Sequence, residues 1–442
     1  MGKMLNMDMA PLHAHRRVLT AALVGTSVEF YDFYVYATAA ALVFGPLFFP
    51  SESASAQLLL SLMSFGLAFF ARPVGAIAFG HFGDRLGRKS TLVVSLLLMG
   101  VSTLLIAFLP TYQMVGWIAP LLLCILRFGQ GFGLGGEWGG AALLAVENAP
   151  PGWEARFGAA PQLGAPIGFL AANGLFLLLG LWLDDAAFTS WGWRIPFLFS
   201  ALLVGLGLWV RLNIKETRDF AEAQDREEVI AVPLSRVLSH HWGALIAAGA
   251  GVVACFAIFY LSTAFALGHM TTERGVAREQ MLALQLAANL FLALGIVLSA
   301  IWSDRISSRF VLGAGAGATV VLGLVFGPAM AGGSLVIVFL TLAFALLVMG
   351  LVYGPLGAWM PTLFPVQLRY TGISIAFNGG GIVGGAVAPV AAQLLSGMGG
   401  TGLVGLFLSV AGVVTLIGVR LGRPLPVLPA QPVLPVRPDA AV

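Results

Sequence analysis

The chain has 442 residues, of which 59% are hydrophobic and only 10% are charged, and its formal net charge is +3. A soluble globular protein carries about 25% charged residues, so this composition excludes one and places most of the chain in a lipid bilayer. The Lys and Arg residues are spread along the loops, which argues against nucleic-acid binding. Cys124 and Cys255 both lie in apolar runs and predict neither a disulfide framework nor a metal site.

A membrane-spanning helix needs roughly 20 consecutive apolar residues, and the sequence contains twelve runs of that kind. The first begins near Val18, is longer than the core of a signal peptide and has no small-residue cleavage site behind it. We therefore predict an all-α integral membrane protein with twelve transmembrane helices. Their predicted centres lie near residues 32, 70, 100, 130, 168, 202, 255, 290, 320, 347, 382 and 410.

A long polar stretch at 211–241 divides the chain, with six predicted spans on each side of it. We read it as a partly helical linker. The expected boundaries are a cytoplasmic N-terminal tail at 1–17, a six-helix bundle at 18–213, a cytoplasmic linker at 214–240, a second six-helix bundle at 241–421 and a disordered proline-rich cytoplasmic tail at 422–442.

The positions of the 23 Lys and Arg residues predict the orientation of the chain. An N-terminus in the cytoplasm leaves only Arg194, Arg274 and Arg278 on the outer side, with Arg72 and Arg127 inside spans. Because cytoplasmic loops are enriched in positive residues, we expect both termini to be cytoplasmic.

Two short charged hairpins lie at corresponding points of the two halves. The first, at 80–89, reads GHFGDRLGRK, and the second, at 303–309, reads SDRISSR. A second pair of segments, at 147–158 and 362–372, matches at a similar separation. Such a duplication predicts two bundles related by pseudo-twofold symmetry, which is typical of transporters.

The first hairpin closely resembles the loop between helices 2 and 3 of the major facilitator superfamily. Within that superfamily the chain is similar to the metabolite:proton symporter family, whose members carry shikimate, 2-oxoglutarate, citrate or proline and betaine. The segments that carry the resemblance span about residues 17–420 and read EFYDF at 29–33, ARPVG at 71–75, RFGQG at 127–131, GGEWGG at 135–140, WGWRIPF at 191–197 and LRYTG at 368–372.

The resemblance implies a site between the bundles, alternating access, and hairpins that latch the cytoplasmic side. The gating residues that it implies are Gly83, Asp84, Arg85, Gly87, Arg88, Asp304, Arg305 and Arg369. Two departures stand out: the second hairpin has Ser303 and Ser307 in place of glycines, and Thr362 stands where the family commonly has a glutamate. We therefore expect a weaker lock in the C-terminal half.

Five ionisable residues lie within the predicted spans, where a charge costs a few kcal/mol and marks a functional candidate: Glu29, Asp32, Arg72, Arg127 and Glu137. Glu29 and Asp32 share a helix face, so they would titrate as a coupled pair that exchanges a proton near neutral pH. Alternatively, one of them pairs permanently with Arg72 or Arg127. Glu137, among four glycines, is either a third coupling carboxylate or an acceptor that orders helix packing.

Arg127 and Arg72 could hold a substrate carboxylate in a bidentate fork, or they could balance the buried carboxylates. In related transporters an arginine at the position of Arg127 is associated with coupling. Polar side chains in apolar spans either line a midplane cavity or make packing hydrogen bonds. The cavity candidates are Tyr31, Gln162, Tyr260, Gln285, Asn289 and Asn378.

These features predict a secondary active transporter of a bacterial inner membrane, acting as a monomer, that takes up a small carboxylate-bearing metabolite together with protons. A proline- or betaine-type osmolyte:proton symporter and a drug/proton efflux pump are the alternatives. No metal-ligand or catalytic-triad grouping is evident in the sequence, so we expect neither an enzyme nor a cofactor.

Overall fold

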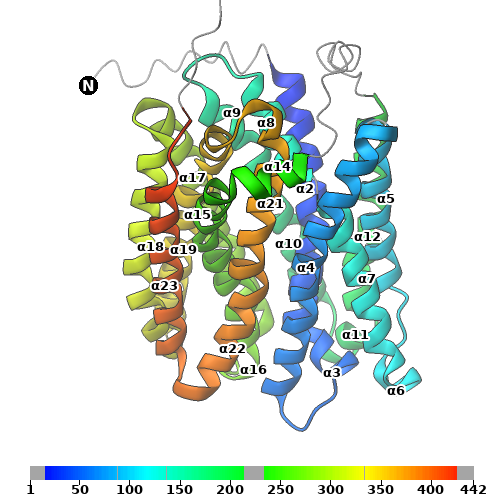
Figure 1. The fold of residues 1–442 in the computed structure, drawn as a ribbon. Helices are drawn as coiled ribbons and strands as arrows, with labels where there is room; N and C mark the ends of the chain where they lie inside the picture. The colour runs from blue at the N-terminus through cyan, green and yellow to red at the C-terminus, as the bar shows by residue number, and fades with distance from the viewer. Residues whose placement is uncertain (1–14, 87, 136, 214–232, 333, 426–442) are drawn as a thin grey trace, which may run out of the picture.

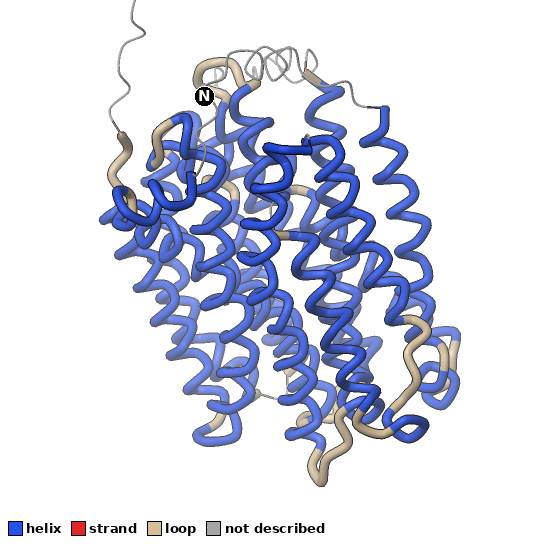
Figure 2. Tube along the Cα trace, turned by 45° about the vertical axis from the view of Figure 1, so that its right-hand side comes forward, coloured by secondary structure: helices blue, strands red, loops and turns tan. Residues whose placement is uncertain are grey.

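A computed structural model describes residues 15–425 of the chain, apart from residues 87, 136, 214–232 and 333. Every regular element within those residues is helical, as Figure 2 shows. The predicted tail residues 1–14 and 426–442, and most of the predicted linker, lie outside the described residues.

The first half of the chain ends with a long helix at Asn213, where the polar stretch begins. Its helices are α2 (Arg16–Ala39), α3 (Gly45–Phe48), α4 (Ala54–Leu86), α5 (Arg88–Ile106), α6 (Tyr112–Val115), α7 (Ile118–Leu134), α8 (Glu137–Glu147), α9 (Glu154–Gln162), α10 (Gly164–Trp182), α11 (Asp185–Ser190) and α12 (Ile195–Asn213).

The second half begins with a short helix inside the predicted linker. Its helices are α14 (Pro233–His240), α15 (Trp242–Tyr260), α16 (Ala266–Thr272), α17 (Arg278–Arg305), α18 (Ser308–Ala331), α19 (Leu335–Tyr353), α20 (Leu356–Trp359), α21 (Arg369–Gly381), α22 (Ala388–Gly399) and α23 (Thr401–Leu421).

The twelve predicted spans are confirmed. All twelve predicted centres fall in helical residues, the eleventh in the π-helical segment between α21 and α22. In the described part of the chain, ten helical stretches are long and apolar enough to cross a bilayer. The other two spans are α5, whose apolar part is Val93–Ile106, and α2, which carries Glu29 and Asp32.

Figure 1 shows the two halves side by side, with their long helices running in the same general direction. The halves meet where α10 packs on α17 and where α4 packs on α21 and α22. We call the end where α2 begins and α23 ends the linker end, at the top of Figure 1. The opposite end, which holds α3, α6 and α11, is the far end.

Both halves carry a π-helical segment at the same place, which supports the predicted duplication. Ala40–Phe44 continues α2 and Leu261–Phe265 continues α15, and these are the first spans of the two halves. A third segment, Ile382–Val387, packs on α4 and α15. Single π-helical turns inside α-helices are often found at functional sites.

Glycines bring α4 and α7 into backbone contact beside the two intramembrane arginines. A Cβ on Gly131 would lie 2.2 Å from the Ala68 carbonyl oxygen, and one on Gly135 would lie 2.1 Å from the Arg72 carbonyl oxygen. Because both contacted atoms belong to the backbone of α4, an added Cβ could be accommodated only if α4 or α7 moved. The glycines therefore fix how far apart the helices of Arg72 and Arg127 can lie.

Gly131→Ala should push α4 away from α7 and lower the stability of the protein, since overpacking costs about 1–3 kcal/mol. The melting temperature of the detergent-solubilised protein, monitored by size-exclusion chromatography after heating, measures this loss of stability. The matched control is Gly174→Ala in α10, where a Cβ meets nothing within 4 Å. Equal melting temperatures for the two variants would contradict the close packing.

Candidate functional site

A cluster of aromatic side chains closes the interface between the halves at mid-depth. We define the central aromatic cluster as Phe33, Tyr34, Phe65 and Phe69 of the first half with Phe256, Phe259 and Tyr260 of the second. The ring centroid of Tyr260 lies 5.1 Å from that of Phe65 and 5.5 Å from that of Phe69. Tyr260, predicted as a cavity residue, therefore lies on the surface of the second half that faces α2 and α4.

Arg72 and Arg127 lie against the same aromatic ring. Their guanidinium carbons are 4.3 Å and 4.2 Å from the ring centroid of Phe33, and their side chains are only 5% and 0% exposed. Tyr36 provides a second face for Arg127, at 4.1 Å. The rings thus stabilise two buried cations by cation–π attraction.

Each arginine has one buried hydrogen-bond donor without an acceptor among the described residues. Nε of Arg72 and Nη2 of Arg127 are buried and have no hydrogen-bond partner among the described residues. Nε of Arg127 donates to the Phe65 carbonyl oxygen at 3.2 Å. An unmet N–H on a buried cation is costly, so these two donors are suited to an incoming anion.

Asp32 lies in the same half and is linked to Arg127 through neutral side chains. Its Oδ1 accepts a hydrogen bond from the Ser200 hydroxyl at 2.5 Å, and its Oδ2 lies 3.2 Å from the Thr103 hydroxyl. Gln130 connects Thr103 to Arg127, at 2.8 Å and 3.0 Å. These five side chains come from α2, α5, α7 and α12, and each is at most 2% exposed.

The other two predicted coupling carboxylates differ in what the structure describes. Glu29 is 5% exposed and acts electrostatically on both Asp32 and Arg72. The side chain of Glu137 lies outside the described residues. Its predicted role stays a prediction.

Three polar side chains form hydrogen bonds between the two halves. Two of them, Asn289 and Asn378, are predicted cavity residues, and the third is Trp138. Asn289 donates to the Pro166 carbonyl oxygen at 2.9 Å, and Asn378 donates to the Gly135 carbonyl oxygen at 2.8 Å. The indole N–H of Trp138, which stacks on Phe377, donates to the Tyr353 hydroxyl at 3.1 Å. These bonds must break if the halves separate at this depth.

The remaining cavity candidates lie in different surroundings. Both amide atoms of Gln162 are buried without a partner among the described residues, beside Gly357 of the other half. Gln285 donates to the carbonyl oxygens of Ser262 and Thr263 in the π-helical segment. Tyr31 instead donates to the Pro196 carbonyl oxygen within its own half, so this geometry gives its predicted cavity role no support.

A small cavity lies beside the cluster. It measures about 10 Å³ and lies between α2, α10, α15 and α17, lined by Tyr34, Ala37, Thr38, Phe169, Asn173, Thr263, Ala264, Leu267 and Gln285. That volume holds about one water molecule, whereas sites for small molecules measure about 300 Å³ or more. This cavity can therefore hold a substrate only if the halves move apart.

An ion pair bridges the halves at the linker end. Asp304, at the end of α17, caps the start of α9: its Oδ1 accepts from the Ala155 amide at 2.8 Å, and its Oδ2 lies 2.6 Å from Nε of Arg156. Asp304 is only 2% exposed, and the guanidinium of Arg156 lies 3.6 Å from the Trp153 ring centroid. The acidic residue predicted for gating thus bonds directly to the other half.

Two other predicted gating residues do not join this bridge. Nε of Arg369 donates to the Pro361 carbonyl oxygen at 3.0 Å, within its own half, and Arg305 lies exposed at the end of α17. The side chains of Asp84, Arg85 and Arg88, and the surroundings of Gly83 and Gly87, lie outside what the structure describes.

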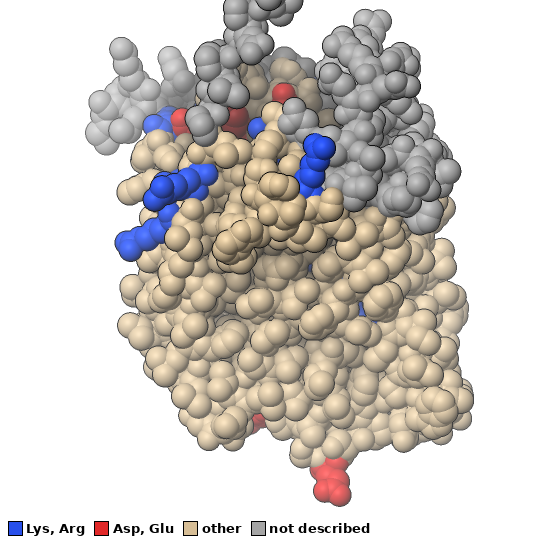
Figure 3. All heavy atoms as spheres, viewed as in Figure 1, with Lys and Arg blue, Asp and Glu red and all other residues tan. Residues whose placement is uncertain are grey.

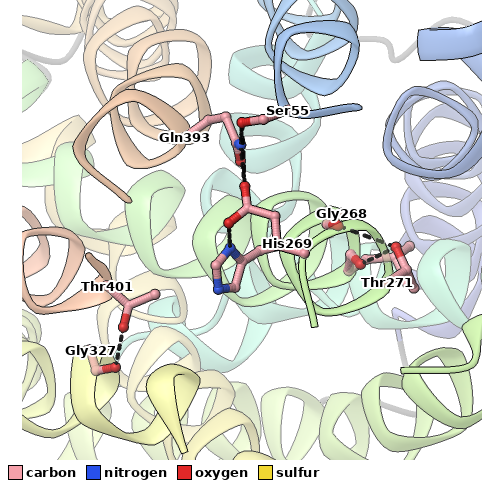
Figure 4. Close-up of polar contacts among 9 residues, drawn as sticks. Ser55, Gly268, His269, Thr271, Gly327, Gln393 and Thr401 are labelled. Carbon is pink, nitrogen blue, oxygen red and sulfur yellow. Dashed lines mark hydrogen bonds and ion pairs between the residues drawn. The ribbon is translucent and has the colours of Figure 1, made fainter. Parts of the chain in front are cut away.

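A polar network bridges the halves at the far end, as Figure 4 shows. Nε2 of Gln393 donates to the Ser55 hydroxyl at 2.8 Å and to the Glu273 carboxylate at 2.7 Å. The other oxygen of Glu273 lies 3.0 Å from Nδ1 of His269. Nearby, Arg278 of α17 pairs with Asp185 of α11 at 3.0 Å. The halves are therefore bridged at both ends in one structure.

Asp304→Asn should weaken the linker-end bridge, because a neutral amide holds Arg156 less strongly than a carboxylate does. Double electron–electron resonance between spin labels on Glu147→Cys and Ser307→Cys, exposed positions on opposite halves, measures the distance between the halves at this end. Cys124 and Cys255 are replaced in every protein measured. We expect a population with a longer label-to-label distance in the Asp304→Asn variant.

Asp185→Asn is the control for that experiment, because Asp185 is 95% exposed and lies at the far end. An exposed pair contributes little, so its loss should leave the linker-end distance unchanged. A distance distribution unaffected by Asp304→Asn would contradict the role of the bridge.

Comparison with known proteins gives the chain clear relatives. A family model described as "Sugar (and other) transporter" matches residues 18–238. The Escherichia coli K12 inner membrane metabolite transport protein YhjE is 43% identical, over 94% of this chain and 95% of its own length. The shikimate transporter of the same strain is 37% identical, over 86% of this chain and 88% of its own.

More distant matches agree in fold. The proline/betaine transporter of Escherichia coli K12 is 28% identical, over 93% of this chain and 85% of its own. The crystal structure of a D-xylose-proton symporter superposes with a TM-score of 0.70 at 16% identity, covering 93% of this chain and 98% of that one. At that identity the likeness shows the fold alone, and it confirms the predicted arrangement of two six-helix bundles.

Proposed function

Because this chain belongs to the sugar (and other) transporter family of the major facilitator superfamily, we propose that it imports a small carboxylate-bearing metabolite together with protons. Membership makes it a multi-pass membrane transporter and not an enzyme. The observation that carries the substrate proposal is the pair of buried arginines on Phe33, each with an N–H that has no partner among the residues that the structure describes.

The charges of the described interior favour binding of a proton and an anion together. Among the described side chains, Glu29 and Asp32 balance Arg72 and Arg127 when both carboxylates are ionised. Glu137, whose side chain lies outside the described residues, is a third carboxylate in the sequence. A proton on Asp32 adds the positive charge that a substrate carboxylate cancels. Since an uncompensated buried charge is strongly destabilising, occupancy by either one favours the other.

The bridges at the two ends supply the alternating access. Opening the linker end breaks the contact between Asp304 and Arg156, and opening the far end separates Gln393 from Ser55. In either opening Tyr260 moves away from the first half and makes room beside the arginines. The proposed cycle exposes the site to one side at a time.

We place the linker end in the cytoplasm of a bacterium, with the protein in the inner membrane. In Figure 3 the Lys and Arg side chains gather near the linker end, above a broad apolar belt. The Lys and Arg side chains near this end include Arg309, Arg420 and Arg423. Their position agrees with the enrichment of positive residues on the cytoplasmic side. The relative YhjE is itself named an inner membrane protein.

A proline- or betaine-type osmolyte is the second candidate cargo. The central aromatic cluster favours it, because aromatic rings attract quaternary ammonium groups, and a relative 28% identical is named a proline/betaine transporter. Two buried arginines beside those rings repel such a group, however, so the carboxylate remains our first choice.

Transport by the purified protein in liposomes tests the proposal. The panel is labelled shikimate, 2-oxoglutarate, citrate, proline and betaine, each with and without an inward proton gradient. We expect gradient-driven accumulation of one organic acid. Asp32→Asn should abolish accumulation and keep exchange of that acid across the membrane, because the site then stays neutral at Asp32. Uptake indifferent to the gradient would contradict proton coupling, and accumulation of betaine would favour the second candidate.

Arg127→Lys should raise the KM for the transported acid by about tenfold, equivalent to ~1.4 kcal/mol. Lysine keeps the charge and loses the planar fork that binds a carboxylate. Arg309→Lys is the matched control, since Arg309 also donates to backbone carbonyls but lies at the linker end. Equal KM values for the two variants would remove Arg127 from the binding site.

A further inference from the structure

We infer that Thr103 and Gln130 form a relay that makes the hydrogen bonding of Arg127 depend on the protonation state of Asp32. The inference rests on the proposed function, because it explains how a bound proton prepares the site for an anion. Neither residue carries a charge, and neither belongs to the predicted site residues. Both act as positioning residues between the two charged ends.

The direction of each hydrogen bond at Gln130 follows from its neighbours. Arginine can only donate, so the Gln130 atom 3.0 Å from Nη1 of Arg127 must be the amide oxygen. The amide nitrogen then faces Thr103, and it can only donate to the hydroxyl oxygen, 2.8 Å away. The hydroxyl of Thr103 is thereby left with a single proton to give.

Thr103 has two acceptors for that one proton. Its Oγ1 lies 3.2 Å from Oδ2 of Asp32 and 2.9 Å from the Met99 carbonyl oxygen, one helical turn earlier in α5. When Asp32 is ionised, the proton points to the carboxylate. When Asp32 is protonated on Oδ2, the acid donates to Thr103, and the hydroxyl proton turns to Met99.

The turn of the hydroxyl changes what Gln130 experiences. With Asp32 ionised, Thr103 accepts only from Gln130, which is held firmly and holds Arg127 in turn. With Asp32 protonated, the hydroxyl oxygen accepts from both the acid and Gln130 through its two lone pairs and no longer donates to a carboxylate. The oxygen is then a weaker acceptor, so Gln130 holds Arg127 less firmly. The guanidinium, which also keeps a free Nη2 donor, can then turn towards a substrate carboxylate. The proton enters and leaves at Asp32 only.

The relay lies within one bundle and is buried throughout. Thr103 and Arg127 are 0% exposed and Gln130 is 2% exposed, so water does not compete for these bonds. Helices α2, α5, α7 and α12 pack on one another within the first half. The relay therefore persists while the two halves move apart, which a contact between the halves could not do.

Other charged or titratable groups face the ends of the relay. Glu29 of α2 acts electrostatically on Asp32, and Arg72 of α4 lies over the Phe33 ring that it shares with Arg127. Tyr36 of α2 and Tyr260 of α15 face Arg127. From α5 and α12 the groups that touch Asp32 are the hydroxyls of Thr103 and Ser200. Apart from Thr103, none of these groups connects Asp32 to Arg127 through the hydrogen bonds named above among the described residues.

The test is the pH dependence of KM for exchange in liposomes without a gradient. The probe is radiolabelled shikimate, or the organic acid of the panel above that the wild-type protein accumulates. The wild-type KM should fall by about tenfold from pH 8 to pH 6, within the usual range of coupling between two sites. Thr103→Val and Gln130→Leu should flatten this dependence to less than about twofold while exchange at saturating probe continues.

Two further variants separate a relay from a merely structural role. Thr103→Ser keeps the hydroxyl and should restore the wild-type slope. Thr319→Val removes a threonine that is equally buried and bonds its own helix at 2.9 Å, to the Gly315 carbonyl oxygen. It should leave the slope unchanged.

A wild-type slope in Thr103→Val would overturn the relay and leave the proposed function standing. A flattened slope in Thr319→Val as well would reduce the effect to lost packing. If the wild-type protein accumulates no acid of the panel under a proton gradient, the proposed function fails and the relay fails with it.

Discussion

The interior of this protein depends on one constraint, which is that two guanidinium groups lie on a single phenylalanine ring inside the membrane. Arg72 and Arg127 are almost fully buried against Phe33. Charges at that depth need partners, and the structure supplies them as aromatic faces, a backbone carbonyl, an amide and two nearby carboxylates. Within the described part of the chain, these partners leave two N–H groups without an acceptor, so an anion that reaches the site can accept from them.

The packing around the arginines means that the two halves must separate before an anion can reach these two N–H groups. Gly131 and Gly135 hold α7 against α4, which fixes the arginines in the first half. Tyr260 of the second half closes over them. The cavity beside the central aromatic cluster is about one water molecule in volume, so a substrate can enter it only if the halves separate. Binding and conformational change are thereby the same event in this account.

The sequence predicted what depends on local properties and missed what depends on which helices are neighbours. Span number and duplication follow from hydrophobic length and repeated motifs, and Asp32, Arg72 and Arg127 stand out because charges are rare in apolar runs. Thr103 and Ser200 are ordinary helix residues in the sequence, and only the packing of α5 and α12 on α2 brings them to Asp32. The partner of Asp304 could not be chosen either, since Arg156 lies 148 residues away in the sequence. The contact of Tyr31 with the Pro196 carbonyl oxygen could not be predicted either, because the sequence does not show which helix each side of α2 faces.

The most direct test of the central claim is a cryo-electron microscopy structure of the protein with the transported acid bound. The account predicts the carboxylate of that acid within hydrogen-bond distance of Nη2 of Arg127 or Nε of Arg72, with Tyr260 displaced from Phe33 and Phe65. A substrate bound elsewhere, with the central aromatic cluster still closed over both arginines, would contradict it.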